Sequence, residues 1–234
     1  MENIILIETS TALCSAALVQ DGKLTGYKEN SKDRAHASLT AVFVKELLEE
    51  AGITLSDCSA VCVSMGPGSY TGLRVGVSTA KGLCFGAGIP LLATGTLDTL
   101  VWQAIDGNLL PEGCQYIVPM IDARRMEVYS AIFSAEGKQI SETAPAIIDE
   151  KSFNEILEQG TVLFIGDGAE KTSGVIKHPN AHFIQCFPKA SSMQHPAIEA
   201  YKEKRFKDVA YFEPFYLKEF VATVSKKNIL SQKR

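Results

Sequence analysis

The sequence predicts an α/β protein built from two lobes, and three observations support this. Residues 3–9 (NIILIET) form a continuous apolar run of the kind that a buried strand requires. The predicted order of strand meander, helix, strand, helix and strand recurs later in a shorter form, which indicates two copies of one α/β unit. Turn residues at 106–108 and 111–113 separate the copies. We therefore expect a first lobe over residues 1–108, a second, smaller lobe over residues 109–190 and a tail over residues 221–234.

The first lobe opens with three predicted strands. A second apolar segment at 14–20 follows the first run, and Asp21-Gly22 comes directly after it. Asp-Gly is a strong hairpin signal because both turn residues must tolerate a positive φ. Residues 23–29 should therefore pair back as the third strand of a meander.

Residues 36–51 should form a helix that ends at Gly52, because glycine suits the left-handed cap position. Two apolar stripes run along this helix, Leu39-Phe43-Leu47-Ala51 and Ala41-Val44-Leu48. Together they are wider than contact with one sheet requires. We therefore expect two packing partners for this helix, of which another protein could be one.

Residues 60–65 should form a strand that leads through Gly66-Pro67-Gly68 into a helix over 71–85. Small residues recur along that helix at Gly72, Gly76, Ala80 and Gly82. Each interior glycine costs up to about 1 kcal/mol relative to alanine, so a helix with several predicts another backbone very close to it. A strand at 89–94 and a helix at 96–105 complete the lobe.

The second lobe should contain strands at 115–121 and 127–134, the latter turning at 135–138 into a third strand. A helix at 149–159 and strands at 161–165 and 181–185 follow. The last predicted element is a polar-faced helix at 191–206, which we expect to pack back onto the first lobe.

The composition excludes several classes of protein. The net charge is −4 and the pI about 5.6, so the chain lacks the clustered basic face that binds nucleic acid unaided. A basic tail (Lys226, Lys227, Lys233, Arg234) is typical of a solvated terminus. The N-terminus does not resemble a signal peptide, and no apolar run could span a membrane. Six scattered cysteines without a CxxC pair indicate reduced thiols, so we expect a cytoplasmic protein without membrane contact.

Polar residues and glycines at predicted strand ends are candidates for a nucleotide cleft. They are Glu8, Thr9, Ser10, Gly66, Gly68, Ser69, Asp122, Gly166, Asp167 and Gly168. Ligands of open α/β sheets bind at strand ends, and a helix N-terminus attracts anions. However, the chain has neither a GxGxxG nor a Walker A pattern. Hydroxyl caps, a tight crossover and a surface salt bridge explain the same residues, so on the residues alone both interpretations stay open.

The remaining chemistry-bearing residues favour no catalytic role. His178 and His182 have the spacing of two ligands on one helix face, but Pro179 and Asn180 prevent a regular helix there. His36 begins a predicted helix and suits packing or capping. No serine or cysteine lies in a GxSxG pattern. We therefore expect no catalytic residue and no metal site.

Several segments together resemble the TsaB (YeaZ) family along almost the whole chain. They are ILIETST (5–11), RAHASLT (34–40), GPGSYTGLRVGVSTAKGL (66–83), IPLLATGTLDTL (89–100), DARRMEVY (122–129) and PFYLK (214–218). The third segment is the most specific, because so many glycines and small residues in one order rarely arise by chance. The resemblance implies the actin-like, Hsp70-like ATPase (ASKHA) fold, with related α/β cores in two lobes and a cleft between them.

The resemblance also implies a function as a non-catalytic partner of TsaD, the paralogue that transfers threonylcarbamoyl from threonylcarbamoyl-AMP to adenosine next to the anticodon of tRNA. The family pairs with TsaD through helices of the first lobe, and TsaE, an ATPase, joins that assembly. Alone, such a chain would form a homodimer, and it would contact tRNA only indirectly. The contact residues on this sequence would be His36, Leu39, Phe43, Leu47, Gly72, Arg74, Val75, Gly76, Val77, Thr79, Ala80 and Leu83.

The same resemblance indicates what the chain lacks. In TsaD the strand matching IPLLA leads to a metal-binding His-x-x-x-His helix, whose histidines correspond to Thr96 and Leu100 here. Neither residue type can replace an imidazole ligand. We therefore expect a pseudo-enzyme that requires no cofactor and binds nucleotide weakly at most. The alternatives are a residual nucleotide-binding ATPase of the same fold and, less favoured, a metallopeptidase of the glycoprotease (M22) type.

Overall fold

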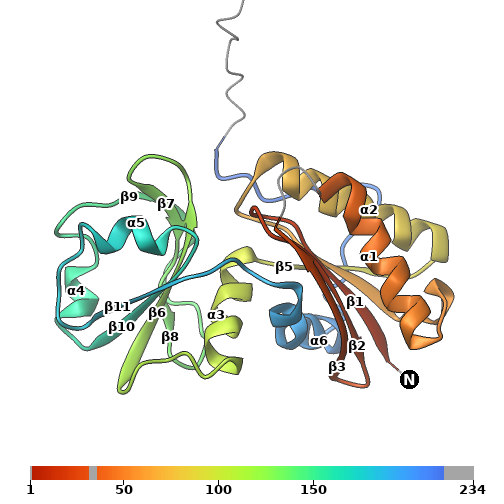
Figure 1. Ribbon diagram of the computed structural model, residues 1–234, viewed down its shortest axis with the longest axis horizontal. Coiled ribbons are helices and arrows are strands. Elements are labelled where there is room, and N and C mark those ends of the chain that lie inside the picture. The colour runs from red at the N-terminus through yellow and green to blue at the C-terminus, as the bar shows by residue number, and fades with distance from the viewer. Residues whose placement is uncertain (1, 32–35, 219–234) are drawn as a thin grey trace, which may run out of the picture.

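The computed structural model describes residues 2–31 and 36–218, which form two β-sheets that lie side by side and are flanked by helices (Figure 1). The first sheet has the strand order β3-β2-β1-β4-β5. Its strands are β1 (Asn3–Glu8), β2 (Cys14–Gln20), β3 (Lys23–Asn30), β4 (Ala60–Ser64) and β5 (Leu91–Thr94). Strands β1 to β3 form the expected antiparallel meander, whereas β4 and β5 run parallel to β1. The carboxyl ends of three parallel strands therefore meet at one edge.

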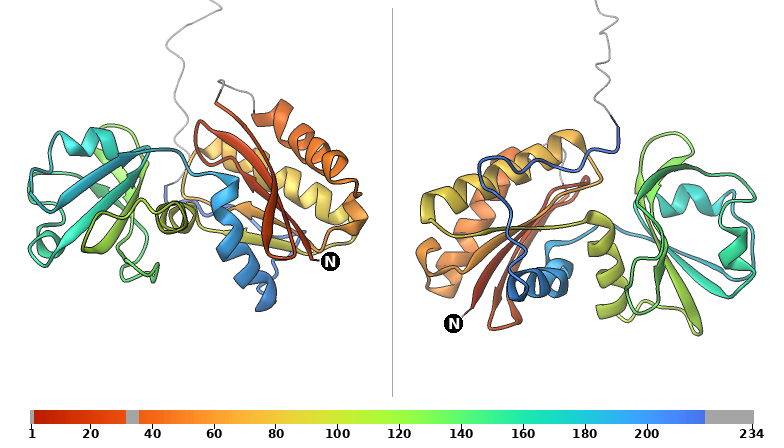
Figure 2. Two further views of the ribbon diagram at one scale, coloured as in Figure 1. Left: turned by 60° about the horizontal axis from the view of Figure 1, so that its bottom comes forward. Right: turned by 180° about the vertical axis from the view of Figure 1, so that it is seen from behind.

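Two long helices cover one face of the first sheet. They are α1 (His36–Ala51) and α2 (Tyr70–Ala87), which lie next to each other (Figure 2). Buried side chains of both helices, such as Val44 and Val77, join Ile5 and Val63 of the sheet in one apolar core. A short 3₁₀ turn, η1 (Leu55–Asp57), links α1 to β4.

The other face of the first sheet is covered by residues from the far end of the chain. They form the 3₁₀ turn η2 (Ala190–Met193) and the helix α6 (Gln194–Lys202). Met193 and Ala197 pack against Ile4 and Leu6 of β1. The helix is shorter than the expected 191–206, because it begins as a 3₁₀ turn and because Lys204, with φ at 57°, adopts a left-handed conformation.

The second sheet has the order β11-β10-β6-β7-β9, and β8 pairs with β6 beside β7. Its strands are β6 (Cys114–Asp122), β7 (Glu127–Ser130), β8 (Phe133–Ser134), β9 (Ala144–Ile147), β10 (Thr161–Gly166) and β11 (Ala181–Gln185). Two short helices, α4 (Asn154–Leu157) and α5 (Ala169–Ser173), belong to this lobe.

Three expectations for the second lobe were wrong in extent. The strand expected at 127–134 is split into β7 and β8. The strand expected after the turn at 135–138 is reduced to a single β-bridge between Phe133 and Gln139. The helix expected at 149–159 is reduced to α4, because Phe153 just before it has a left-handed φ of 66°. Helix α5 has no counterpart in the sequence-based expectations.

Helix α3 (Thr96–Asp106) lies between the two sheets (Figure 1). We assigned it to the first lobe, but its buried residues Leu97 and Leu100 share a core with Ile117 and Leu163 of the second sheet. On its other side α3 contacts η2 and α6. The physical reason is that α3 is apolar around much of its surface, so both lobes bury part of it.

Candidate functional site

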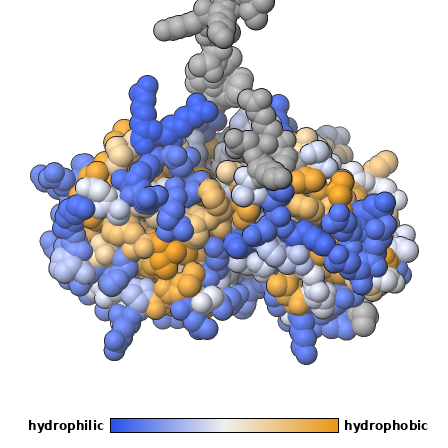
Figure 3. Space-filling model, viewed as in Figure 1, coloured by the Kyte–Doolittle hydropathy of each residue, from blue (hydrophilic) through white to orange (hydrophobic). Residues whose placement is uncertain are grey.

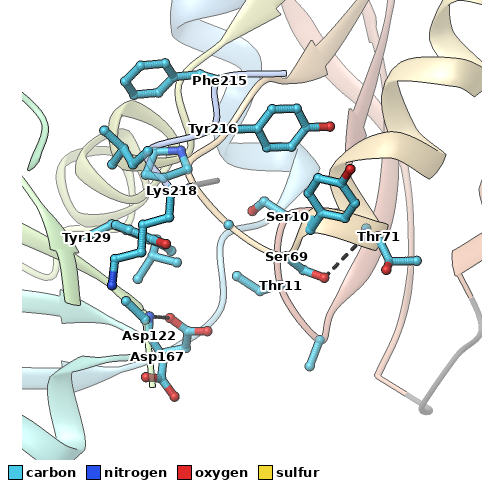
Figure 4. Close-up of a pocket in the computed structure, with 18 of the residues that line it drawn as sticks. Ser10, Thr11, Ser69, Thr71, Asp122, Tyr129, Asp167, Phe215, Tyr216 and Lys218 are labelled. Atoms are coloured by element: carbon cyan, nitrogen blue, oxygen red, sulfur yellow. Dashed lines mark hydrogen bonds between the residues drawn. The ribbon is translucent and has the colours of Figure 1, made fainter. Parts of the chain in front are cut away.

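A cleft of about 990 Å³ lies between the two lobes, next to the ends of β1 and β6 (Figure 4). The first lobe contributes Ser10, Thr11 and the start of α2, and the second lobe contributes Asp122, Arg124 and Asp167. The C-terminal residues 215–218 form a third wall. The cleft is therefore closed on one side by a segment from the end of the described chain.

Glu8 ends β1, and its carboxyl group is completely buried behind the cleft wall. Its Oε1 accepts hydrogen bonds from the backbone N–H of Ser10 at 2.6 Å and from the hydroxyl of Ser64 at 2.9 Å. No group in the described part of the chain reaches Oε2. Burial raises the pKa of Glu8 to about 7, although these hydrogen bonds oppose the shift. The carboxyl group is therefore a buried acid and does not line the cleft.

The glycine loop at 66–69 packs against the chain that follows β1. The backbone N–H of Ser69 donates to the carbonyl of Ser10 at 2.6 Å, and the Ser69 hydroxyl caps α2 by accepting from the N–H of Gly72. A Cβ at Gly68 would lie 2.4 Å from the Ser10 carbonyl oxygen, and one at Gly72 would lie 2.1 Å from that of Thr9. In the direction of a Cβ, these glycines are packed against the protein's own backbone, while both also line the cleft.

In the second lobe, Gly166 and Gly168 likewise allow close packing of the chain. A Cβ at Gly166 would lie 2.2 Å from the carbonyl oxygen of Met120, and one at Gly168 would lie 2.8 Å from a methyl group of Val128. Both glycines therefore let the loop after β10 approach β6 and β7. Close packing within the lobe explains them without a ligand.

Two carboxylates of the second lobe face the cleft. The backbone N–H of Asp122 donates to Asp167 Oδ1 at 2.8 Å, and the Lys171 ammonium forms an ion pair with Asp122. Burial raises the pKa of Asp167 to about 6. Asp122 and Asp167 thus form a small network with one lysine.

Of the ten residues proposed for a nucleotide cleft, the structure brings five to its surface. These are Ser10, Gly68, Ser69, Asp122 and Asp167. Glu8, Thr9, Gly66, Gly166 and Gly168 do not line it. The sequence-based expectation missed the cleft aromatics Tyr70, Tyr129, Phe215 and Tyr216, and also Lys218. The aromatic run 214–218 was the available signal for the C-terminal wall.

Half of the residues expected to contact a partner are buried inside the first lobe. These are Phe43, Leu47, Gly72, Gly76, Val77 and Ala80. The second packing partner of α1 within this chain is α2, and Thr9 packs against two glycines of α2, through its backbone carbonyl at Gly72 and through its side chain at Gly76. The small and apolar pattern of these six residues serves packing within the lobe, and their contact with a partner stays a prediction. Arg74 is exposed, and His36, Leu39, Val75, Thr79 and Leu83 are half-buried.

The exposed side of α1 and α2 nevertheless forms an uncharged strip, which we call the outer helix face. It consists of the exposed residues Ala37, Ala41 and Val42 of α1 and Thr71, Ser78, Gly82 and Phe85 of α2, together with the half-buried Val75 of α2. The five α2 positions recur at three- and four-residue spacing and so share one side of that helix. Figure 3 shows hydrophobic surface at the N-terminal end of α1 and hydrophilic surface farther along the helix.

The histidines and the expected positions of lost metal ligands give no cluster. The His36 ring nitrogen Nε2 bonds the carbonyl of Thr11 at 2.8 Å, and His178 Nδ1 accepts from the N–H of Asn180. Thr96 and Leu100 are both fully buried on α3. Among residues 2–31 and 36–218, no group of three or more His, Cys, Asp or Glu is placed to hold a metal ion.

Comparison with known proteins gives a consistent result. The family model described as TsaD, tRNA N6-adenosine threonylcarbamoyltransferase, matches residues 26–225. A protein of Escherichia coli K12 named tRNA threonylcarbamoyladenosine biosynthesis protein TsaB is 31% identical over 229 residues, covering 94% of this chain and 96% of that protein. A Bacillus subtilis protein of the same name is 30% identical over 61% of this chain and 59% of its own length. The chain belongs to the TsaB family.

A solved member of the TsaB family has the same fold. YeaZ from Pseudomonas aeruginosa is 26% identical and covers 93% of this chain and all of its own, with a TM-score of 0.79. A polyphosphate/ATP-glucomannokinase from Arthrobacter, 12% identical with a TM-score of 0.50, covers 87% of this chain and all of its own, and shares the fold alone. The expected actin-like ATPase fold is therefore confirmed.

Two of the TsaB family segments lie at the two surfaces described above. GPGSYTGLRVGVSTAKGL forms the loop beside the cleft and most of α2, while PFYLK forms the C-terminal wall of the cleft. Of the segment RAHASLT, Arg34 and Ala35 lie outside the described residues, as does the tail at 221–234. No helix within 2–31 or 36–218 is long and apolar enough to cross a membrane.

Proposed function

We propose that this chain is a non-catalytic partner of TsaD in the formation of threonylcarbamoyl-adenosine on tRNA, and that it binds TsaD through the outer helix face. The names of relatives that match along most of the chain support the role in tRNA modification. The observation that carries the partner role is the outer helix face itself, which is exposed, uncharged and built on two adjacent helices.

The physical character of the outer helix face suits helix-to-helix contact. Gly82 and Ser78 add little bulk, so a partner helix can approach the backbone of α2 closely. Phe85 and Val42 are 84% and 42% exposed, and they offer apolar area that a partner would remove from water. Interface cores are depleted of charge, and the charged neighbours Lys45 and Arg74 would lie at the rim.

The non-catalytic part of this proposal is supported by the side chains at two positions. Thr96 and Leu100 offer a hydroxyl and a hydrocarbon group where the family resemblance places the metal-binding histidines of TsaD. The glycine loops are packed against Thr9, Ser10 and Met120, so we infer that nucleotide binds weakly at most and that no cofactor is required.

The same face explains the assemblies we infer. An apolar face of this kind would pair with a second copy when TsaD is absent, because a two-fold interface uses one patch twice. TsaE would join the complex with TsaD, and contact with tRNA would be indirect. Because the molecule that is modified is tRNA, we infer that the chain acts in the cytoplasm.

Two substitutions test the partner role. Val42→Glu and Ser78→Glu each put a carboxylate into the outer helix face at an exposed position, so the fold should survive. Burying an unpaired charge in an interface costs several kcal/mol. We expect the affinity for TsaD, measured by calorimetry, to fall more than about 100-fold, and threonylcarbamoyl-adenosine in cellular tRNA to fall with it.

The matched control is Ile147→Glu, which places the same charge on a 79% exposed residue of β9, far along the chain from the outer helix face. It should bind TsaD like the unchanged chain. Val77 is unsuitable for this test because its side chain is only 4% exposed, so a charge there would disrupt the core. Undiminished binding by both Val42→Glu and Ser78→Glu would contradict the proposal.

A further inference from the structure

The described chain ends in an extended segment, residues 207–218, which we call the strap. It begins at the edge of the first sheet, where the backbone N–H of Lys207 donates to the carbonyl of Leu91 at 2.8 Å. It then follows α2, where the Lys81 ammonium donates to the carbonyl of Ala210 at 2.9 Å. Figure 2 shows this blue segment running along the first lobe, from the region of α6 to α2 on the opposite face of the first sheet, and ending on the side that faces the second lobe.

At the cleft the strap is fitted to the loop that precedes α2. The backbone N–H of Phe215 donates to the carbonyl of Met65 at 2.7 Å. A Cβ at Gly66, whose φ is +109°, would lie 2.7 Å from the carbonyl oxygen of Phe215. The close approach at Gly66 is therefore made by the strap, and this loop and the strap are complementary in shape.

Side chains reinforce this contact. The rings of Tyr216 and Tyr70 have centroids 5.0 Å apart, within the range of attractive aromatic pairs. Arg74 lies with its guanidinium carbon 4.2 Å from the centroid of the Tyr70 ring, and its Nε donates to the Tyr216 hydroxyl at 3.3 Å. Tyr70, Arg74 and Tyr216 thus form one contact group at the mouth of the cleft.

The end of the strap reaches the other lobe. The Lys218 ammonium forms an ion pair with the carboxylate of Glu127 on β7 and lies 5.9 Å from the ring centroid of Tyr129. Figure 4 shows the Lys218 side chain extending toward Tyr129 across the cleft. The strap therefore contacts both lobes.

We propose that the strap is a latch that holds the two lobes at one relative orientation, with Lys218 and Glu127 as its closing contact. The chain itself passes between the sheets at residues 94–96 and again at 186–190. With only these two crossings, the lobes can still rotate relative to each other about the line that joins the crossings. The backbone resists this rotation least. A third connection at the cleft mouth opposes that rotation. This latch acts within one chain.

The Lys218–Glu127 ion pair and the Tyr216 contacts are each weak, and separate substitutions test them. An exposed ion pair such as that of Lys218, which is 44% exposed, changes an equilibrium by only about two- to fivefold. Lys218→Met and Glu127→Gln should each raise the open population by about that factor, and the double variant should do no more than either alone. Combining Lys218→Met with Tyr216→Ala also removes the contacts of Tyr216 with Tyr70 and Arg74 and should release the strap.

Two measurements on the full chain test the latch. Hydrogen exchange of the Phe215 amide reports whether the strap is docked, because that N–H is bonded to Met65. Spin labels carried on non-natural amino acids at the exposed positions Thr54 and Lys151 report the distance between the lobes and leave the native cysteines in place. Lys45→Met is the matched control, since it removes an exposed lysine of α1 away from the strap.

In the unchanged chain and in Lys45→Met we expect one narrow distance distribution and a protected Phe215 amide. In the Tyr216→Ala/Lys218→Met variant we expect exchange at least about tenfold faster and a clearly broader distribution. The latch is refuted if exchange accelerates while the distance distribution stays narrow. It is also refuted if the distribution is already broad in the unchanged chain, or if the double variant leaves Phe215 protected.

Discussion

Gly72 lies so close to Thr9 that a Cβ at position 72 would be 2.1 Å from the Thr9 carbonyl oxygen. The Thr9 hydroxyl in turn donates to the carbonyl of Gly72 at 2.9 Å, so the two residues are joined by both shape and hydrogen bonding. One turn later, a Cβ at Gly76 would lie 2.2 Å from the same hydroxyl oxygen. The position of α2 on the first sheet therefore depends on these two glycines.

Gly72→Ala should destabilise the protein by about 2 kcal/mol or more, because neither backbone can move away without disturbing α2. Gly82→Ala is the control on the same helix. A Cβ there meets nothing within 4 Å, so the helix preference of alanine should raise stability by up to about 1 kcal/mol. Urea unfolding of the isolated chain measures both. Equal effects of the two substitutions would show that the close approach to Thr9 does not matter.

Glu8 predicts a specific dependence of stability on pH. Its pKa is about 7 in the folded chain and 4.5 for a free side chain, so the folded state holds the proton more tightly. The free energy of unfolding should therefore fall as the pH rises from about 4.5 to 7, by roughly 3 kcal/mol in total, and then level off.

Glu8→Gln removes this titration while keeping an oxygen that can accept from Ser10 and Ser64. Relative to the unchanged chain, the variant should be similar in stability at pH 5 and more stable at pH 8. Urea unfolding at the two pH values gives the difference directly. Parallel stability curves for the two proteins would rule out a raised pKa at Glu8.

The turn between β6 and β7 holds two arginines in an unusual conformation. Arg124 and Arg125 have φ values of 70° and 51°, which cost non-glycine residues about 1–2 kcal/mol each. Arg125→Gly should therefore raise the thermal midpoint, since glycine adopts this conformation without steric cost. Ala123→Gly, at a neighbour without a positive φ, should lower it instead. A lower midpoint for both would indicate that the arginine side chain itself stabilises the turn.

The first lobe could be predicted closely because its signals are local. The strand Cys14–Gln20 and the helix His36–Ala51 match the expected bounds, since a hairpin dipeptide follows the strand and a capping glycine follows the helix. The second lobe was predicted less well. Phe153 adopts a left-handed conformation that nothing in its sequence neighbourhood indicates, and this ends the helix expected at 149–159.

In the candidate site, too, features with a local sequence signal could be predicted and features that depend on distant contacts could not. Asp122 and Asp167 could be placed at the cleft because they follow the ends of predicted strands. The strap could not, because Phe215 meets Met65 through a contact between residues far apart in sequence. Of the α2 glycines, only Gly72 lies against a close backbone, that of Thr9, whereas Gly76 lies against the Thr9 side chain and a Cβ at Gly82 or Gly86 would meet nothing within 4 Å. The residue pattern alone does not reveal which segment supplies the close backbone.

The return of the chain to the first lobe has a consequence during synthesis on the ribosome. Ala190, Met193 and Ala197 cover the second face of the first sheet, so that sheet keeps one apolar face open until almost the whole chain has been translated. Domains usually fold in the order in which they are made. Here the first lobe is translated first, but its folding can be completed only after the C-terminal residues have been made. A fragment ending at residue 108 should therefore gain protease resistance only when a separate 190–218 peptide is added.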